Sequence, residues 1–405
     1  MTNKNNNNNN NNSNSKRITD RVKKGQKKGG APTKLLSFEQ LVAQAEKYAE
    51  EYELEKAIDS FERALKMQPK DTTIMDALGE LCIEIGLFDK ATKHFVNSIK
   101  TNPNDSYTKY MNLGQLLGGQ EAIKSYTKAI ELMELQLQSI MSQMTPEQLK
   151  KLEESYQKLH NQKKQQQQEE EEEGQEEEGD EEQEDMMDDE EEVVEEEQEE
   201  EEPVLFLKDQ LSSALCSLAE LYLTDECFDD NAEMECEKNL RKAIGYAPYS
   251  PEPYSLLGSM KISQCKNEEA LELISHSYTI WADYEIEDLP SLEYRFGIAQ
   301  MFVELDQNRI AVVILESIVN QQDNIAEIWY TLGMVYHNLK EDRSAQDCLE
   351  TALKLLTIVA KGGQDKELED QIKSLLVTVN EIVATLPPEE DEVEEEEEQQ
   401  MDDDQ

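Results

Sequence analysis

The sequence is poor in the features that catalysts, membrane proteins and secreted proteins usually carry. Its 405 residues include six cysteines, four histidines and two tryptophans, and no two cysteines form a Cys-x-x-Cys pair. We interpret the cysteines as reduced packing thiols and expect no metal site, because neither cysteines nor histidines show ligand spacing. No apolar run approaches the roughly 18 residues that span a membrane, and the N-terminus lacks the apolar segment of a signal peptide. We therefore expect a soluble, intracellular protein without a membrane partner.

Catalytic motifs and strand signals are also missing. The sequence has no glycine-rich phosphate loop, and no Ser/His/Asp or Cys/His grouping that we can place in one pocket. Carboxylates are abundant, but in charge runs they indicate solvation rather than a paired acid and base. We predict that the protein is not an enzyme and binds no cofactor.

A 34-residue spacing is present along most of the chain. A small residue, an aromatic residue, a second small residue and a proline recur one period apart, at Ala57, Phe61, Ala64 and Pro69 and at Ala91, Phe95, Ser98 and Pro103. Small side chains allow paired helices to approach each other, and proline ends the second helix. This spacing is that of the second half of a tetratricopeptide unit, a helix–turn–helix repeat.

The first half of the unit is clearest near the C-terminus. The Trp-Leu-Gly-Tyr-Ala-Ala pattern of the repeat is matched by Trp329, Leu332, Gly333, Tyr336, Ala345 and Ala352, and the preceding unit has Arg295, Ile298, Ala299, Phe302, Ala311 and Leu315 in the same positions. We predict seven units, with starts near Phe38, Thr72, Tyr110, Leu215, Pro251, Leu292 and Ala326. The third unit is compressed at Gly118–Gly119, and the fourth has about five extra residues in its turn. A helix over residues 366–386 is expected to cap the array.

The net charge of −51 is concentrated in two segments. Residues 169–202 hold 25 acidic residues and no basic one, and residues 389–405 hold 12 more. We expect both segments to be disordered, because they have almost nothing apolar to bury. The predicted fold is an all-α tetratricopeptide helical-repeat superhelix. Its expected parts are a disordered Asn-rich and then basic segment (residues 1–35), units one to three with an extended helix (36–160), a Gln/Glu-rich acidic insertion (161–203), units four to seven with the capping helix (204–388), and an acidic tail (389–405).

Cations cluster in the N-terminal segment. The cluster comprises Lys16, Arg17, Lys23, Lys24, Lys27 and Lys28. It fits a nuclear-import signal, which would make import factors partners, or a contact for another anionic group. Alternatively, it is a solvated tail that folds back on the acidic insertion. Direct nucleic-acid binding is disfavoured, because the rest of the molecule would repel phosphates.

The first helices of successive tetratricopeptide units line a concave groove. At groove-facing positions the sequence has five carboxylates and three apolar residues: Glu46, Asp76, Glu80, Glu220, Glu252, Phe296, Tyr330 and Met334. The clamp of heat-shock co-chaperones holds a carboxylate with Lys and Asn, but this chain has Val42, Asp76, Met111 and Cys216 in the corresponding places. We therefore predict a strongly basic protein ligand. The three apolar residues are candidate anchors for it, and core packing between units is their alternative role.

Two stretches in the C-terminal half resemble one particular family. They are PEPYSLLGSMKISQCKNEEALELISHSYTIW over residues 251–281 and DNIAEIWYTLGMVY over residues 323–336. Together with the acidic tail and the overall size, they resemble the tetratricopeptide family of dedicated assembly chaperones for the large-subunit ribosomal protein uL four. The resemblance implies a non-enzymatic protein that captures newly made uL four, keeps its basic extensions soluble, accompanies it from cytoplasm to nucleus and releases it onto pre-ribosomes.

The competing interpretation is an acidic histone chaperone of the tetratricopeptide type, which also has an acidic tract breaking into its repeats. In that family the tract lies inside an early repeat of a four-repeat domain. In this chain it falls between units of a predicted array of seven. We therefore favour the ribosomal interpretation.

Overall fold

The computed structural model describes residues 36–152, 191–359 and 366–387. Over these ranges the chain consists of helices and turns, without a strand. It divides into two compact units, residues 1–94 and residues 95–405, which we call the N-terminal and the C-terminal unit. None of the described helices is both long and apolar enough to cross a membrane.

The N-terminal unit contains two helix pairs. They are α1 (Phe38–Glu50) with α2 (Leu54–Met67), and α3 (Thr72–Glu84) with the first part of α4 (Phe88–Thr101). A capping box starts α1, because Ser37 and Gln40 each bond the other's backbone N–H. Asp71 caps α3 by accepting the N–H of Ile74 at 3.1 Å. The small and aromatic pattern residues form the core here: Ala57, Phe61, Ala64 and Ala91 are all buried.

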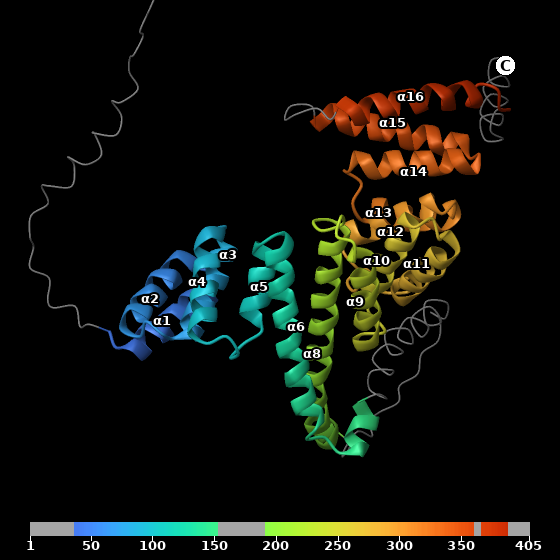
Figure 1. Cartoon of the computed structure of the whole chain (residues 1–405). Coiled ribbons are helices and arrows are strands. Elements are labelled where there is room, and N and C mark those ends of the chain that lie inside the picture. The colour runs from blue at the N-terminus through green and yellow to red at the C-terminus, as the bar shows by residue number, and fades with distance from the viewer. Residues whose placement is uncertain (1–35, 153–190, 360–365, 388–405) are drawn as a thin grey trace, which may run out of the picture. The chain divides into compact units, whose positions relative to one another are not determined.

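The C-terminal unit continues the same arrangement of consecutive helices, labelled in Figure 1. They are α5 (Thr108–Leu116), α6 (Gly119–Met141), α8 (Glu191–Leu223), α9 (Ala232–Tyr246), α10 (Glu252–Ser263), α11 (Asn267–Trp281), α12 (Leu292–Glu304), α13 (Asn308–Gln321), α14 (Ala326–Leu339), α15 (Asp342–Val359) and α16 (Lys366–Val383). Helices α10 to α15 pack in pairs, each first helix against the second helix that follows it. The structure confirms the predicted all-α tetratricopeptide-type repeat.

Glycines in the first helices allow this pairing. A Cβ atom placed on Gly258 would lie 2.5 Å from Ile274 Cγ1, and one on Gly333 would lie 2.9 Å from Leu349 Cγ. Both distances are shorter than a normal carbon–carbon contact of about 3.5–4.0 Å. The glycine of the repeat pattern is therefore required for close approach of the two helices, not for an unusual backbone conformation.

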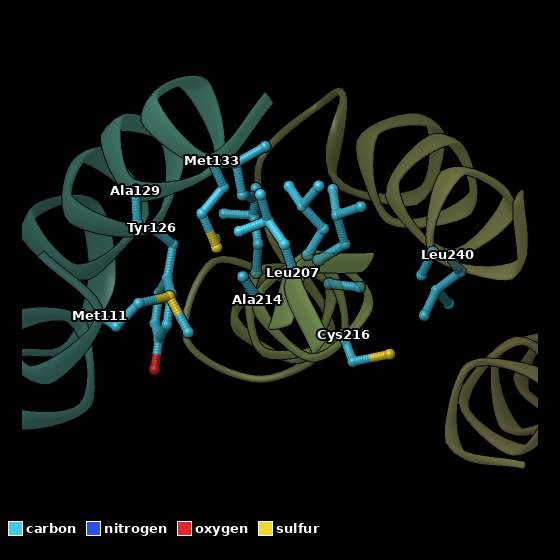
Figure 2. Packing of buried hydrophobic residues seen from close by; sticks show 14 of the residues in the cluster. Met111, Tyr126, Ala129, Met133, Leu207, Ala214, Cys216 and Leu240 are labelled. Carbon is cyan, nitrogen blue, oxygen red and sulfur yellow. The ribbon is translucent and has the colours of Figure 1, made fainter. Parts of the chain in front are cut away.

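The largest apolar cluster among the described residues joins α5, α6, α8, α9 and α10. Figure 2 shows side chains from α6 and α8 meeting in its middle, with Met133 on α6 and Leu207 on α8. Both are almost completely buried. Residues 142–190 separate these two helices in sequence. The packing of α6 on α8 therefore joins the third helix pair to the fourth.

The start of α8 differs from the sequence-based prediction. We expected the chain to return to the repeat near Pro203, but α8 begins at Glu191 and contains Pro203 inside it. Glutamate has a high intrinsic helix propensity, so a glutamate-rich run can extend a helix that is anchored by packing further along. Helix α8 thus includes residues 191–203, which the sequence analysis assigned to the acidic insertion. The rest of the acidic insertion, the N-terminal segment and the acidic tail lie outside the described residues.

Among the described residues of the C-terminal unit, three cations are buried, each 4% exposed or less. Lys109 forms an ion pair with Asp105, and Lys261 forms ion pairs with Glu237 at 3.1 Å and Glu269 at 3.5 Å. Arg295, which occupies the position of Trp329 one unit earlier, donates to the Pro290 carbonyl at 3.0 Å and to Gln321 Oε1 at 2.7 Å. These three cations therefore bond to groups of the chain itself.

Candidate partner-binding surface

In the N-terminal unit, the predicted acidic positions lie on α1 and α3. Glu46 on α1 and Glu80 on α3 are exposed, and Asp76 on α3 is half-buried. All three belong to the first helices of their pairs, as the repeat pattern predicted. The N-terminal unit thus presents carboxylates on the helices that line the groove of a tetratricopeptide array.

In the C-terminal unit, Glu220 on α8 and Glu252 on α10 are the corresponding carboxylates. Glu220 is exposed and Glu252 is half-buried. Neither carboxylate makes a hydrogen bond or an ion pair with any described residue. Burial raises the pKa of Glu220; it also raises the pKa of Glu252, and the negative charge of Glu220 adds to that shift. The two glutamates are therefore close enough to repel each other, and no cation among the described residues is a cause of either pKa shift.

Glu220 lies in a hollow of about 640 Å³ between three first helices, which we call the α8 hollow. It is the one charged side chain among the described residues that line this hollow. The lining residues are Gly114, Gln115, Leu117, Tyr126, Ser217, Glu220, Leu221, Leu223, Thr224, Leu256, Ser259 and Ser263. Apolar walls and hydroxyl groups thus surround a single carboxylate.

Tyr330 and Met334 lie in a second hollow, of about 950 Å³, between α14 and α16, which we call the α16 hollow. Its other lining residues are Lys366, Glu367, Asp370, Gln371, Ser374, Leu375 and Thr378, all on α16. Both Tyr330 and Met334 are half-buried. The capping helix therefore forms one wall of a hollow and does more than cover the last face of the array.

Phe296 is not among the residues that line the α16 hollow. It lies on α12, half-buried, and packs against the apolar cluster that contains Phe302 and Trp281. The structure thus brings two of the three predicted anchors together and places the third on another apolar cluster. The predicted import residues Lys16, Arg17, Lys23, Lys24, Lys27 and Lys28 lie outside the described residues.

The positions that hold cations in a carboxylate clamp are apolar in the C-terminal unit. Met111 on α5 and Cys216 on α8 are buried, and burial, with the charges of Glu252 and Glu220, raises the pKa of the Cys216 thiol. A neutral thiol and a thioether cannot bind a carboxylate. This surface is suited to cationic ligands.

Several residues of these hollows were not identified from the sequence. Ser217, Leu221 and Thr224 share one face of α8 with Glu220, and Leu256 and Ser259 share one face of α10, at helical spacings of three and four residues. The spacing alone could have placed them beside Glu220. The contribution of α16 to the α16 hollow could not be found in this way, because α16 lies outside the repeat pattern.

Fold and surface together define a helical-repeat protein of the tetratricopeptide type, and the family model described as "Tetratricopeptide repeat" matches residues 326–355. Two curated relatives are both named "Probable assembly chaperone of rpl4". The chain is 30% identical to the Schizosaccharomyces pombe protein over 194 residues, 43% of this chain and 57% of that protein. It is 21% identical to the Emericella nidulans protein over 297 residues, 70% of this chain and 60% of that protein. The matches thus span less than two thirds of either relative.

A solved structure has the same fold. It is described as "Assembly Chaperone of RpL4 (Acl4) (Residues 1-338)", with a TM-score of 0.58 and 21% identity, and the match covers 76% of this chain and 98% of that chain. The resemblance to assembly chaperones that we inferred from residues 251–281 and 323–336 is confirmed by the names of these proteins.

Proposed function

We propose that the protein is a dedicated, non-enzymatic chaperone that captures a newly made basic ribosomal protein, keeps it soluble and delivers it for assembly of the large ribosomal subunit. The proposed partner is uL four, the protein that the names of the relatives give as rpl4. The observation that carries the proposal is the pair Glu220 and Glu252, two carboxylates on successive first helices without a cation among the described residues. A basic ligand supplies that cation.

The charge of the surface explains recruitment, and the apolar residues explain selectivity. An exposed ion pair is worth only about 0–1 kcal/mol, so many carboxylates must act together. Their combined field raises the rate of encounter with a basic protein. Tight binding also needs partly buried apolar anchors, and Tyr330 and Met334 in the α16 hollow supply them. The hydroxyl of Tyr330 makes no hydrogen bond to a described residue, which leaves it available to a ligand.

We further propose that the protein acts in both the cytoplasm and the nucleus, with import factors as additional partners through the cationic cluster of residues 16–28. A ribosomal protein made in the cytoplasm has to reach the site of subunit assembly without adhering to RNA. An acidic carrier protects it, because bound carboxylates occupy the cations that would otherwise contact phosphates. A histone would be bound by the same charges, so charge alone does not separate the two partners.

The test is affinity purification of the full-length chain, followed by competition between purified uL four and histone H3–H4 at physiological salt. Electrostatic adsorption is partly screened under these conditions. We expect uL four as the stoichiometric partner. Tyr330→Ala should lower the affinity for uL four by about thirtyfold, which corresponds to about 2 kcal/mol for an aromatic anchor. The matched control is Tyr52→Ala, at an exposed tyrosine of the N-terminal unit. Stoichiometric histone binding that excludes uL four would refute the proposal.

A further inference from the structure

We infer that the α8 hollow receives one long cationic side chain, a lysine or an arginine, from the protein partner. This inference rests on the proposed function and names a particular contact within it. The hollow is formed by α5, α8 and α10, which are first helices of three successive pairs, together with Tyr126 of α6. Its volume of about 640 Å³ is within the range of sites that hold small ligands.

The walls of the hollow suit an aliphatic stem. Four leucines line it: Leu117 directly after α5, Leu221 and Leu223 on α8, and Leu256 on α10. Lysine and arginine bury their methylene groups along apolar surface while the charged end seeks a polar partner. A short cation would leave these leucines in contact with water, so the hollow favours a side chain with several methylene groups.

The polar groups of the hollow suit a positive charge. Glu220 supplies a carboxylate, and the hydroxyls of Ser217, Thr224 and Ser259 supply oxygen acceptors. Tyr126, which is only 5% exposed, contributes to the wall of the hollow. Figure 2 shows the Tyr126 hydroxyl turned away from Met133 and Leu207.

Other ligand classes fit this hollow poorly. An anion would meet Glu220, with Glu252 and the Cys216 thiol close to it and no lining cation. A neutral apolar side chain would remove Glu220 from water without a partner, which is costly for a carboxylate. A bound cation instead offsets the burial that raises the pKa of this glutamate.

The experiment measures the affinity of full-length protein variants for purified uL four by calorimetry. Glu220→Gln keeps the shape of the side chain and removes its charge, and Glu272→Gln removes a charge from an exposed position on α11, outside the hollow. Loss of a charge-assisted contact should weaken binding about ten- to hundredfold for Glu220→Gln, against less than about twofold for Glu272→Gln. A third variant, Ser259→Phe, fills the hollow without altering charge and should weaken binding similarly.

Three results would overturn the inference. If Glu220→Gln and Ser259→Phe bind uL four as tightly as the unaltered protein, the partner does not use the hollow, and the proposed function stands without it. If Glu220→Gln binds more tightly, a basic residue of the chain itself occupies the hollow. If the unaltered protein does not bind uL four at all, the proposed function fails together with the inference. Circular dichroism of each variant checks that the helices are retained.

Discussion

Gly258 provides the most direct test of the helix-pair packing. Alanine at this position would place its Cβ atom 2.5 Å from Ile274 Cγ1, 3.1 Å from Ile274 Cδ1 and 3.5 Å from the Ala270 carbonyl oxygen. Ile274 is completely buried, so its side chain has little space in which to move. We therefore expect Gly258→Ala to force α10 and α11 apart or Ile274 into a strained rotamer.

The net effect combines two opposing contributions. Replacing glycine with alanine inside a helix stabilises it by about 0.5–1 kcal/mol. Overpacking of a well-packed core costs about 1–3 kcal/mol. At Gly258 the overpacking cost is larger, and we expect a net destabilisation of about 1–2 kcal/mol. At Gly245, on α9, nothing lies within 4 Å of the added Cβ, so Gly245→Ala should stabilise the protein by up to about 1 kcal/mol.

Urea unfolding followed by tryptophan fluorescence measures both effects. Trp281 on α11 is buried beside Tyr278, with ring centroids 5.0 Å apart, so its emission reports on the helix that Gly258 contacts. The transition midpoint should fall for Gly258→Ala and rise for Gly245→Ala. A rise in both variants would show that α10 and α11 are not in the close contact described above, and the argument from glycine would be refuted.

Three further predictions concern charge. Glu252→Gln should stabilise the protein at pH 7 and have little effect near pH 4, as measured by urea titrations at both pH values. Burial and the charge of Glu220 raise the pKa of Glu252 in the folded protein. The unaltered protein therefore loses stability as the pH rises from the ordinary glutamate pKa of about 4.3 through the raised value. Lys261→Met should lower the free energy of unfolding by about 1–3 kcal/mol in the same assay, because it leaves two carboxylates without their buried partner. Lys238→Met, at an exposed ion pair, is the control and should lower it by at most about 1 kcal/mol. Deletion of residues 169–190 should leave the melting temperature nearly unchanged, because that segment has no apolar pattern that could pack. It should also slow association with a basic partner at low salt, measured by stopped-flow fluorescence, because the segment's negative charge is lost.

The repeat pattern was sufficient to predict the helices and their pairing. Small residues of the pattern such as Ala57 and Ala345 are fully buried. A pattern of this kind is local, because each helix pair contacts mainly its neighbours along the chain. The sequence therefore predicted the fold of the described residues closely, apart from the start of α8.

The surface was less predictable, because hollows depend on contacts that no period specifies. Glu220 could be placed on the groove side from its position in the repeat, but its location beside Tyr126 depends on the packing of α6 against α8. Likewise, Tyr330 is paired with α16, a helix outside the repeat. The half-buried state of Glu252 also follows from tertiary packing and could not be predicted from sequence spacing.

The distribution of cations connects the fold to the proposed function. Lys109 and Lys261 are buried and bound to carboxylates within the C-terminal unit, and Arg295 is buried against a carbonyl and an amide. Cations used in this way cannot neutralise Glu220 on α8 and Glu252 on α10, which remain without a cation among the described residues. Glu252 is half-buried, and burial of an unpaired carboxylate opposes folding, so a ligand that supplies positive charge would offset this cost. Under the proposed function, a basic partner would gain affinity from these unpaired carboxylates.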